Sequence, residues 1–225
     1  MAICRVVSLR GHESDRIWDM LDIQIHAAAP PFDRPALGVR AARLLGLAEA
    51  MGLLPPGDPI YRLDAEAMKA PVEELVRRSI GRNASLQLAA TDEPERLAEL
   101  LDELYGELEA SPVPAAESAR LTAVFGLDLL AKLTGASTSS LRRYAAAERV
   151  APDGVAARLH HLARINAHLA GGYNDFGIRR WYVRPRVQLD DHAPADLLSG
   201  AWDPDAEGPQ RTLRLAEALN SSPAT

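Results

Sequence analysis

Apolar residues recur every three or four positions along most of this 225-residue chain, and prolines and glycines separate the periodic stretches. Such spacing gathers apolar side chains on one face of a helix, and it predicts helices over residues 36–53, 64–81 and 94–108. Pro55-Pro56-Gly57 ends the first of these, and Pro71 marks a kink in the second or its start. The first half of the chain is therefore expected to be helical.

Residues 15–28 mix apolar and polar positions with few turn-forming residues, and we expect another helix there. Residues 110–114, Ala-Ser-Pro-Val-Pro, can continue neither a helix nor a central strand, so we place a domain boundary at this point. The expected fold class is all-α, with a helical N-terminal region of unknown role over residues 1–110 and a linker over residues 111–117.

The composition is that of an ordinary globular protein, with 47% apolar and 25% charged residues. Cys4 is the single cysteine, which excludes an intramolecular disulfide and suits a reducing compartment. The N-terminus has no sustained apolar segment of the kind that a secretory signal needs, and no stretch is long enough to cross a membrane. We expect a cytoplasmic protein without a membrane partner.

The charge is unevenly distributed along the chain. Between residues 118 and 186 there are eleven basic and four acidic residues, a net charge of +7, although the whole chain carries −6. A basic segment inside an acidic protein is expected when one face meets phosphate. Plain solvation by surface arginines explains the same pattern equally well, so charge alone does not decide between them.

The segment from Leu127 to Tyr144 has the features of a helix-turn-helix. Gly135 stands where a tight turn needs a left-handed residue, and Ser137 is a good N-cap for the helix that follows. Ala131 is small where the two helices would cross, and Leu133 and Leu141 would pack the turn from inside; we expect DNA binding to involve Ser137, Thr138, Ser139, Arg142, Arg143 and Arg149. A helical hairpin that only packs is the alternative.

Four short motifs follow one another in the second half. They are Leu141-Arg142-Arg143-Tyr144, Glu148-Arg149-Val150-Ala151-Pro152 with the helix 155–162, the run from Gly177 to Pro185 around Arg180-Trp181, and Ala193-Pro194-Ala195-Asp196-Leu197-Leu198. With these motifs in the family's order, residues 121–219 resemble the Xre, MbcA and ParS antitoxin family. One element departs from the family, because Leu189-Asp190-Asp191-His192 stands where the family has a glycine-bearing loop.

The resemblance implies that the first part of the matched region binds operator DNA. It also implies that the C-terminal part forms a helical surface for a toxin of the RES class, a group of NAD-degrading enzymes. The residues that match the toxin-binding motif are Trp181, Pro185, Pro194, Asp196, Leu197 and Leu198. Considered without the resemblance, these residue types favour structural roles: Trp181 suits a core, Pro194 a helix start, and Asp196 the first turn of that helix.

An enzyme is the function class with the least support in the sequence. His160 and His161 are adjacent and point to different sides of a helix, so we expect surface or half-buried histidines and no metal site. Gly171-Gly172 follows a helix and not a strand, which makes it a helix C-cap instead of a phosphate loop. We expect no cofactor and no catalytic residues.

The sequence therefore predicts a DNA-binding antitoxin-like regulator that autorepresses its operon and neutralises a cognate toxin. Its expected parts are the helix-turn-helix region 118–170, a toxin-binding-like helical region 171–219 and a tail 220–225. Double-stranded DNA, a toxin and a second copy of the chain are the expected partners, since helix-turn-helix proteins commonly read paired half-sites. Two alternatives stay open: a stand-alone regulator without a toxin, and a helical adaptor that binds only proteins.

Overall fold

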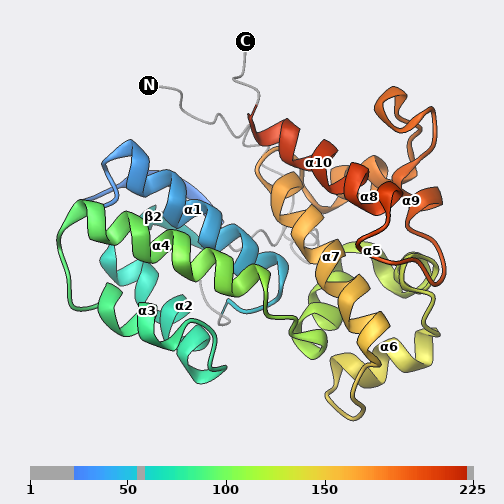
Figure 1. The fold of residues 1–225 in the computed structure, drawn as a ribbon, viewed down its shortest axis with the longest axis horizontal. Helices are drawn as coiled ribbons and strands as arrows, with labels where there is room; N and C mark the ends of the chain where they lie inside the picture. The colour runs from blue at the N-terminus through green and yellow to red at the C-terminus, as the bar shows by residue number, and fades with distance from the viewer. Residues whose placement is uncertain (1–22, 55–58, 222–225) are drawn as a thin grey trace, which may run out of the picture.

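The structure is a computed structural model that describes residues 23–54 and 59–221. These described residues form ten α-helices, one short 3-10 helix (Val187–Leu189) and two short strands, arranged in two halves that lie side by side (Figure 1). The expected all-α fold class is confirmed, with one small sheet added to it. None of the helices in the described part of the chain is long and apolar enough to cross a membrane.

The first half contains the three helices that the periodic pattern predicts. They are α1 (Pro35–Ala50), α2 (Ala65–Arg77) and α4 (Pro94–Glu109), and they bury a leucine-rich core. Pro71 lies inside α2, on its buried face. Ser79 and Gly81 take positive φ angles that end the second helical stretch early, and the short helix α3 (Arg82–Leu88) follows.

The prediction of a helix over residues 15–28 is wrong for its second part. Residues Ile23–Ala28 form the strand β1, which pairs in parallel with β2 (Ile60–Leu63); residues 15–22 lie outside the described residues. Ile23 and Ile25 alternate with polar neighbours and pack against the first core, which is the spacing of a strand. The partner strand is more than thirty residues away, so no local signal showed the pairing.

The second half is built from α5 (Pro114–Thr134), α6 (Thr138–Ala145), α7 (Asp153–Ala170), α8 (Asp175–Val183), α9 (Pro194–Leu197) and α10 (Glu207–Ser221). A second apolar cluster fills its centre, and Trp181 and Tyr182 are among its largest side chains. The helix α10 continues to Ser221, two residues into the segment expected to be a tail.

The two halves meet along α1, α5 and α7. The helix α4 ends at Glu109 and α5 begins at Pro114, where the two prolines interrupt the helical pattern. Ala163 of α7 nevertheless belongs to the core of the first half. Arg120 of α5 also reaches across to Glu49 of α1, so the halves share both apolar and charged contacts.

Candidate nucleic-acid interface

The helix-turn-helix begins at a break inside α5. Gly126 has φ 73° and ψ 163°, a conformation almost restricted to glycine, which separates the stretch 127–134 from the rest of the helix. Gly135 follows with φ 71°, and Ser137 caps α6, because its Oγ accepts a hydrogen bond from the Ser140 amide at 3.2 Å. The turn chemistry expected from Gly135 and Ser137 is therefore confirmed.

One face of α6 holds the helix on the core. Leu141 and Tyr144 are buried, and Leu133 packs the turn from below, as the sequence predicted for both leucines. The hydroxyl of the buried Ser118 donates to the Leu141 carbonyl at 3.3 Å and ties α6 to the first part of α5. The orientation of α6 is thus set by apolar burial and by one buried hydrogen bond.

The opposite face of α6 is polar and open to solvent. Ser139, Arg142 and Arg143 are exposed, and Thr138 is partly buried. Within the described residues, no salt bridge involves Arg142 or Arg143. Two unneutralised guanidinium groups beside small hydroxyl side chains offer the donors that base edges and phosphates accept.

The turn after α6 extends this basic surface. The Arg143 carbonyl accepts hydrogen bonds from the Glu148 amide at 2.9 Å and the Arg149 amide at 3.3 Å, and Ala147 takes φ 55°. Arg149 is exposed, and Val150 keeps 89% of its surface accessible. The hydrogen bonds hold this turn against the C-terminal end of α6, so the exposed Arg149 lies close to that end.

The eleven basic residues between positions 118 and 186 divide into two groups. Five of them are used inside the molecule, where they pair with carboxylates, carbonyls or an aromatic ring: Arg120, Arg158, Arg164, Arg179 and Arg186. Six others are exposed: Lys132, Arg142, Arg143, Arg149, Arg180 and Arg184. The net charge of +7 therefore overstates the charge that a partner meets, and α6 with its following turn holds half of the exposed cations.

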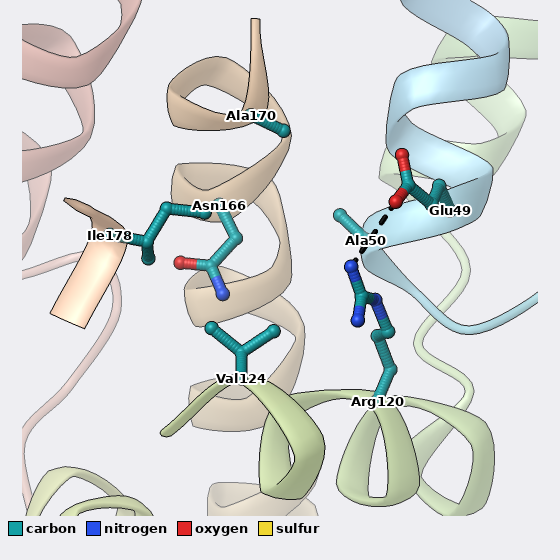
Figure 2. Close-up of a pocket in the computed structure, with 7 residues that line it drawn as sticks. All are labelled: Glu49, Ala50, Arg120, Val124, Asn166, Ala170 and Ile178. Carbon is teal, nitrogen blue, oxygen red and sulfur yellow. Dashed lines mark hydrogen bonds and ion pairs between the residues drawn. The ribbon is translucent and has the colours of Figure 1, made fainter. Parts of the chain in front are cut away.

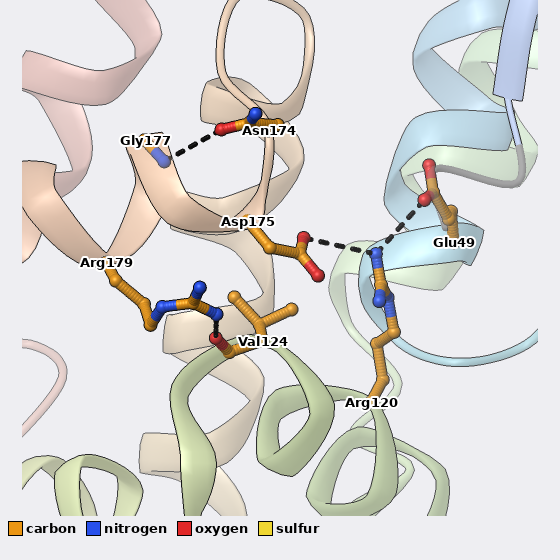
Figure 3. A network of polar contacts seen from close by, with 7 residues as sticks. All are labelled: Glu49, Arg120, Val124, Asn174, Asp175, Gly177 and Arg179. Atoms are coloured by element: carbon orange, nitrogen blue, oxygen red, sulfur yellow. Dashed lines mark hydrogen bonds and ion pairs between the residues drawn. The ribbon is translucent and has the colours of Figure 1, made fainter. Parts of the chain in front are cut away.

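A polar network joins α8 to both halves (Figure 3). The Nη2 atom of Arg120 lies 3.1 Å from Glu49 Oε1 and 3.9 Å from Asp175 Oδ1 at the start of α8. Arg179 donates from Nη1 to the Val124 carbonyl at 2.6 Å, just before the break in α5. Glu49 is 4% exposed, so its ion pair with Arg120 is largely shielded from water.

A pocket lies beside this network, between α1, α5, α7 and α8 (Figure 2). Its lining residues are Glu49, Ala50, Arg120, Val124, Asn166, Ala170 and Ile178. A volume of about 10 Å³ has room for about one water molecule, so an organic cofactor does not fit there. No group of three metal-ligating side chains occurs among the described residues.

His160 and His161 are both buried, which corrects the expectation of surface or half-buried histidines. His160 Nε2 donates to the Glu109 carbonyl at 2.8 Å, and its Nδ1 lies 2.6 Å from Glu117 Oε1. Burial alone lowers the pKa of His160, but the hydrogen bond and charge of Glu117 outweigh burial and raise it. His161 packs against Trp202, and burial lowers its pKa to about 4.

The residues that match the toxin-binding motif do not form a single exposed surface. Trp181 is 1% exposed, and Pro194 and Leu198 are buried too, so these three shape the C-terminal region from inside and do not present side chains to a partner. Leu197 is partly buried, whereas Pro185 and Asp196 are exposed. Asp196 accepts a hydrogen bond from the Ala193 amide at 3.2 Å, which is the helix-start role expected from its position.

A different set of residues is exposed next to Trp181. Phe176, Arg180, Val183 and Arg184 are spaced so that they share one side of α8 and its end. We call these four residues the α8 face; Phe176 is 62% and Val183 54% exposed. Sequence reasoning missed this face, although the spacing of two apolar residues and two arginines at i, i+4, i+7 and i+8 was available as a signal.

The loop over residues 189–192 has a backbone conformation that is typical of glycine. Asp190 and Asp191 have φ 55° and 59°, in the left-handed region that glycine adopts most readily and that aspartate tolerates. Arg211 of α10 pairs with Asp190 at 2.7 Å and donates to the Gln188 carbonyl at 2.9 Å. The loop is therefore held by backbone hydrogen bonds and by contacts with Arg211, and aspartates occupy its left-handed positions in place of glycine. No family model, curated protein or solved structure matches the chain.

Proposed function

We propose that this protein is a cytoplasmic regulator that binds double-stranded DNA through α6. The observation that carries the proposal is the exposed face of α6, where Arg142 and Arg143 have no acidic partner among the described residues while Leu141 and Tyr144 anchor the opposite face. A helix held this way presents rigid donors to a groove, which is what direct reading of base edges requires. Arg149 and the free amides at the start of α6 add phosphate contacts.

The test is DNA binding measured by fluorescence anisotropy, with a labelled duplex from upstream of the protein's own gene. We expect Arg142→Ala/Arg143→Ala to weaken binding about tenfold or more, since each bidentate arginine contact is worth about 1–3 kcal/mol. The matched control is Arg180→Ala/Arg184→Ala, which removes the same charge from α8 and should change binding by less than about twofold. Equal losses in both variants would show non-specific attraction and contradict the proposal.

We also propose that the protein acts as a homodimer, because two copies of α6 are needed to read paired half-sites. Light scattering of the protein alone and with a duplex measures the number of chains per DNA. Two chains on one site are the expected result. A single chain at saturation would contradict the dimer while leaving the role of α6 intact.

A second proposed function is the neutralisation of a cognate RES-class toxin, as the resemblance implies. The observation that favours it is the α8 face, where aromatic, aliphatic and arginine side chains stand together in solvent. Such residue types are enriched at protein interfaces, and exposed apolar side chains gathered on one face mark a site for a partner. DNA and toxin then bind at different helices of the same half.

Co-expression with the product of the neighbouring gene tests this second function. We expect growth to be rescued and a complex to co-purify, and we expect Phe176→Asp to lose the complex while DNA binding is kept. Val39→Asp is the matched control, since Val39 is 60% exposed on α1 of the other half. The absence of both toxicity and a complex would leave the stand-alone regulator, and loss of the complex in both variants would move the interface away from α8.

A further inference from the structure

A short segment after α9 is bound to the end of the first helix of the helix-turn-helix. We call residues 199–202 the C-terminal strap. The Gly200 amide donates to the Lys132 carbonyl at 3.0 Å, and Trp202 Nε1 donates to the Leu133 carbonyl at 2.6 Å. Both acceptors lie in the last turn of α5, where carbonyls have no partner within the helix, so the strap supplies the missing donors.

The strap also touches the turn itself. A Cβ atom built on Gly135 would lie 2.6 Å from the Gly200 carbonyl oxygen, closer than real Cβ contacts. Gly135 therefore serves two purposes: it accepts φ 71°, and it lets the strap approach the backbone of the turn. This turn connects directly to Ser137, the cap of α6.

The other side of the strap is held by α7. Arg158 Nη1 donates to the Trp202 carbonyl at 3.2 Å, and the rings of His161 and Trp202 meet edge to face with centroids 5.3 Å apart. Trp202 is thus placed between α7 and the end of α5. The strap follows α9, so the C-terminal region and the helix-turn-helix share this connection.

We infer that Trp202 is a positioning residue for DNA recognition, because the strap fixes the turn from which α6 begins. The inference rests on the proposed function of α6. It makes the C-terminal region a structural part of the DNA-binding unit and not an independent attachment. Loss of the indole donor would let the turn open more often, and the positions of Arg142 and Arg143 would then be less well defined.

The test compares Trp202→Phe with Trp181→Phe. The first variant keeps an aromatic ring beside His161 but removes the donor to Leu133 and part of the indole. The second makes the same change at Trp181, which packs against Tyr182 in the core. Hydrogen exchange of the free protein is measured for the amides of residues 133–145, together with DNA affinity. We expect Trp202→Phe to speed exchange in these residues about fivefold and to weaken DNA binding by a similar factor, as the loss of one hydrogen bond predicts.

We expect Trp181→Phe to lower the melting temperature without either local effect. Exchange in residues 133–145 that is unchanged in Trp202→Phe would overturn the inference, whether or not the protein binds DNA. If the wild-type protein binds no DNA but Trp202→Phe speeds local exchange, the proposed function fails and the positioning of the turn stands. Faster exchange without any loss of DNA affinity would overturn the role of Trp202 in recognition.

Discussion

The contact between Gly135 and the strap can be tested by two alanine substitutions with the same backbone strain. Gly135 has φ 71° and Gly200 has φ 74°, so Gly135→Ala and Gly200→Ala each place an L-residue in the left-handed region at a cost of about 1–2 kcal/mol. A Cβ on Gly200 meets nothing within 4 Å, but a Cβ on Gly135 would lie 2.6 Å from the Gly200 oxygen. Only the first substitution must push the strap away.

Displacing the strap also endangers the hydrogen bond from the Gly200 amide to the Lys132 carbonyl, worth about 0.5–1.5 kcal/mol. Gly135→Ala should therefore cost about 2–3 kcal/mol. For a chain of this size, Gly200→Ala should lower the melting temperature by about 4 °C and Gly135→Ala by about 8 °C, measured by scanning calorimetry.

Gly46→Ala is the control, because Gly46 lies inside α1 with open space around it and alanine favours a helix there. This variant should be as stable as the wild type or slightly more stable. Equal losses for Gly135→Ala and Gly200→Ala would refute the reasoning, since the close approach would then contribute nothing.

Three further predictions concern buried groups. Burial lowers the pKa of His161 to about 4, so between pH 6.5 and pH 4 the unfolded chain binds a proton at this histidine and the folded chain does not, which costs about 3 kcal/mol of stability as the pH falls through this range. The urea midpoint should therefore decrease more steeply in the wild type than in His161→Gln when the pH is lowered from 6.5 to 4. Equal slopes would contradict the buried environment of His161. Arg120→Met should destabilise the fold by about 3–5 kcal/mol because it removes the ion pair with the buried Glu49 carboxylate, and adding Glu49→Gln should restore part of this loss in denaturant titrations. Losses that simply add in the double variant would rule out coupling between the two residues. Leu141→Ala should lower the free energy of unfolding by about 2–5 kcal/mol, since Leu141 packs α6 onto the core. It should also reduce DNA affinity at temperatures where the variant is still folded. Unchanged DNA affinity would show that recognition does not depend on how α6 is held.

The sequence predicted those elements whose signals are local. The helices α1, α2 and α4 have long periodic stripes with proline or glycine near their ends, and the turn at Gly135 and Ser137 needs residues with special backbone or capping chemistry. Each of these signals lies within a few consecutive residues. Whether the predicted helix or turn forms therefore depended little on the elements that pack against it.

Features that depend on distant partners could not be read in this way. The strand β1 forms because β2 and the first core lie beside it, and the burial of His160 depends on Glu109 and Glu117 from the preceding helices. The contacts of the strap with α5 bring residues together across more than sixty positions. The family resemblance suggested Trp181 as a partner contact, whereas its residue type favoured the core; the fold buries Trp181 and leaves the α8 face outside.

The central claim is that α6 reads DNA sequence, and selection of binding sites from a random double-stranded library tests it most directly. The wild-type protein and the single variants Arg142→Ala and Arg143→Ala are each taken through the same rounds of selection. We predict that the wild type enriches one motif and that each variant loses preference at a different base pair of it, while the remaining positions are kept. Enrichment of no motif by the wild type, or the same motif from all three proteins, would contradict the account.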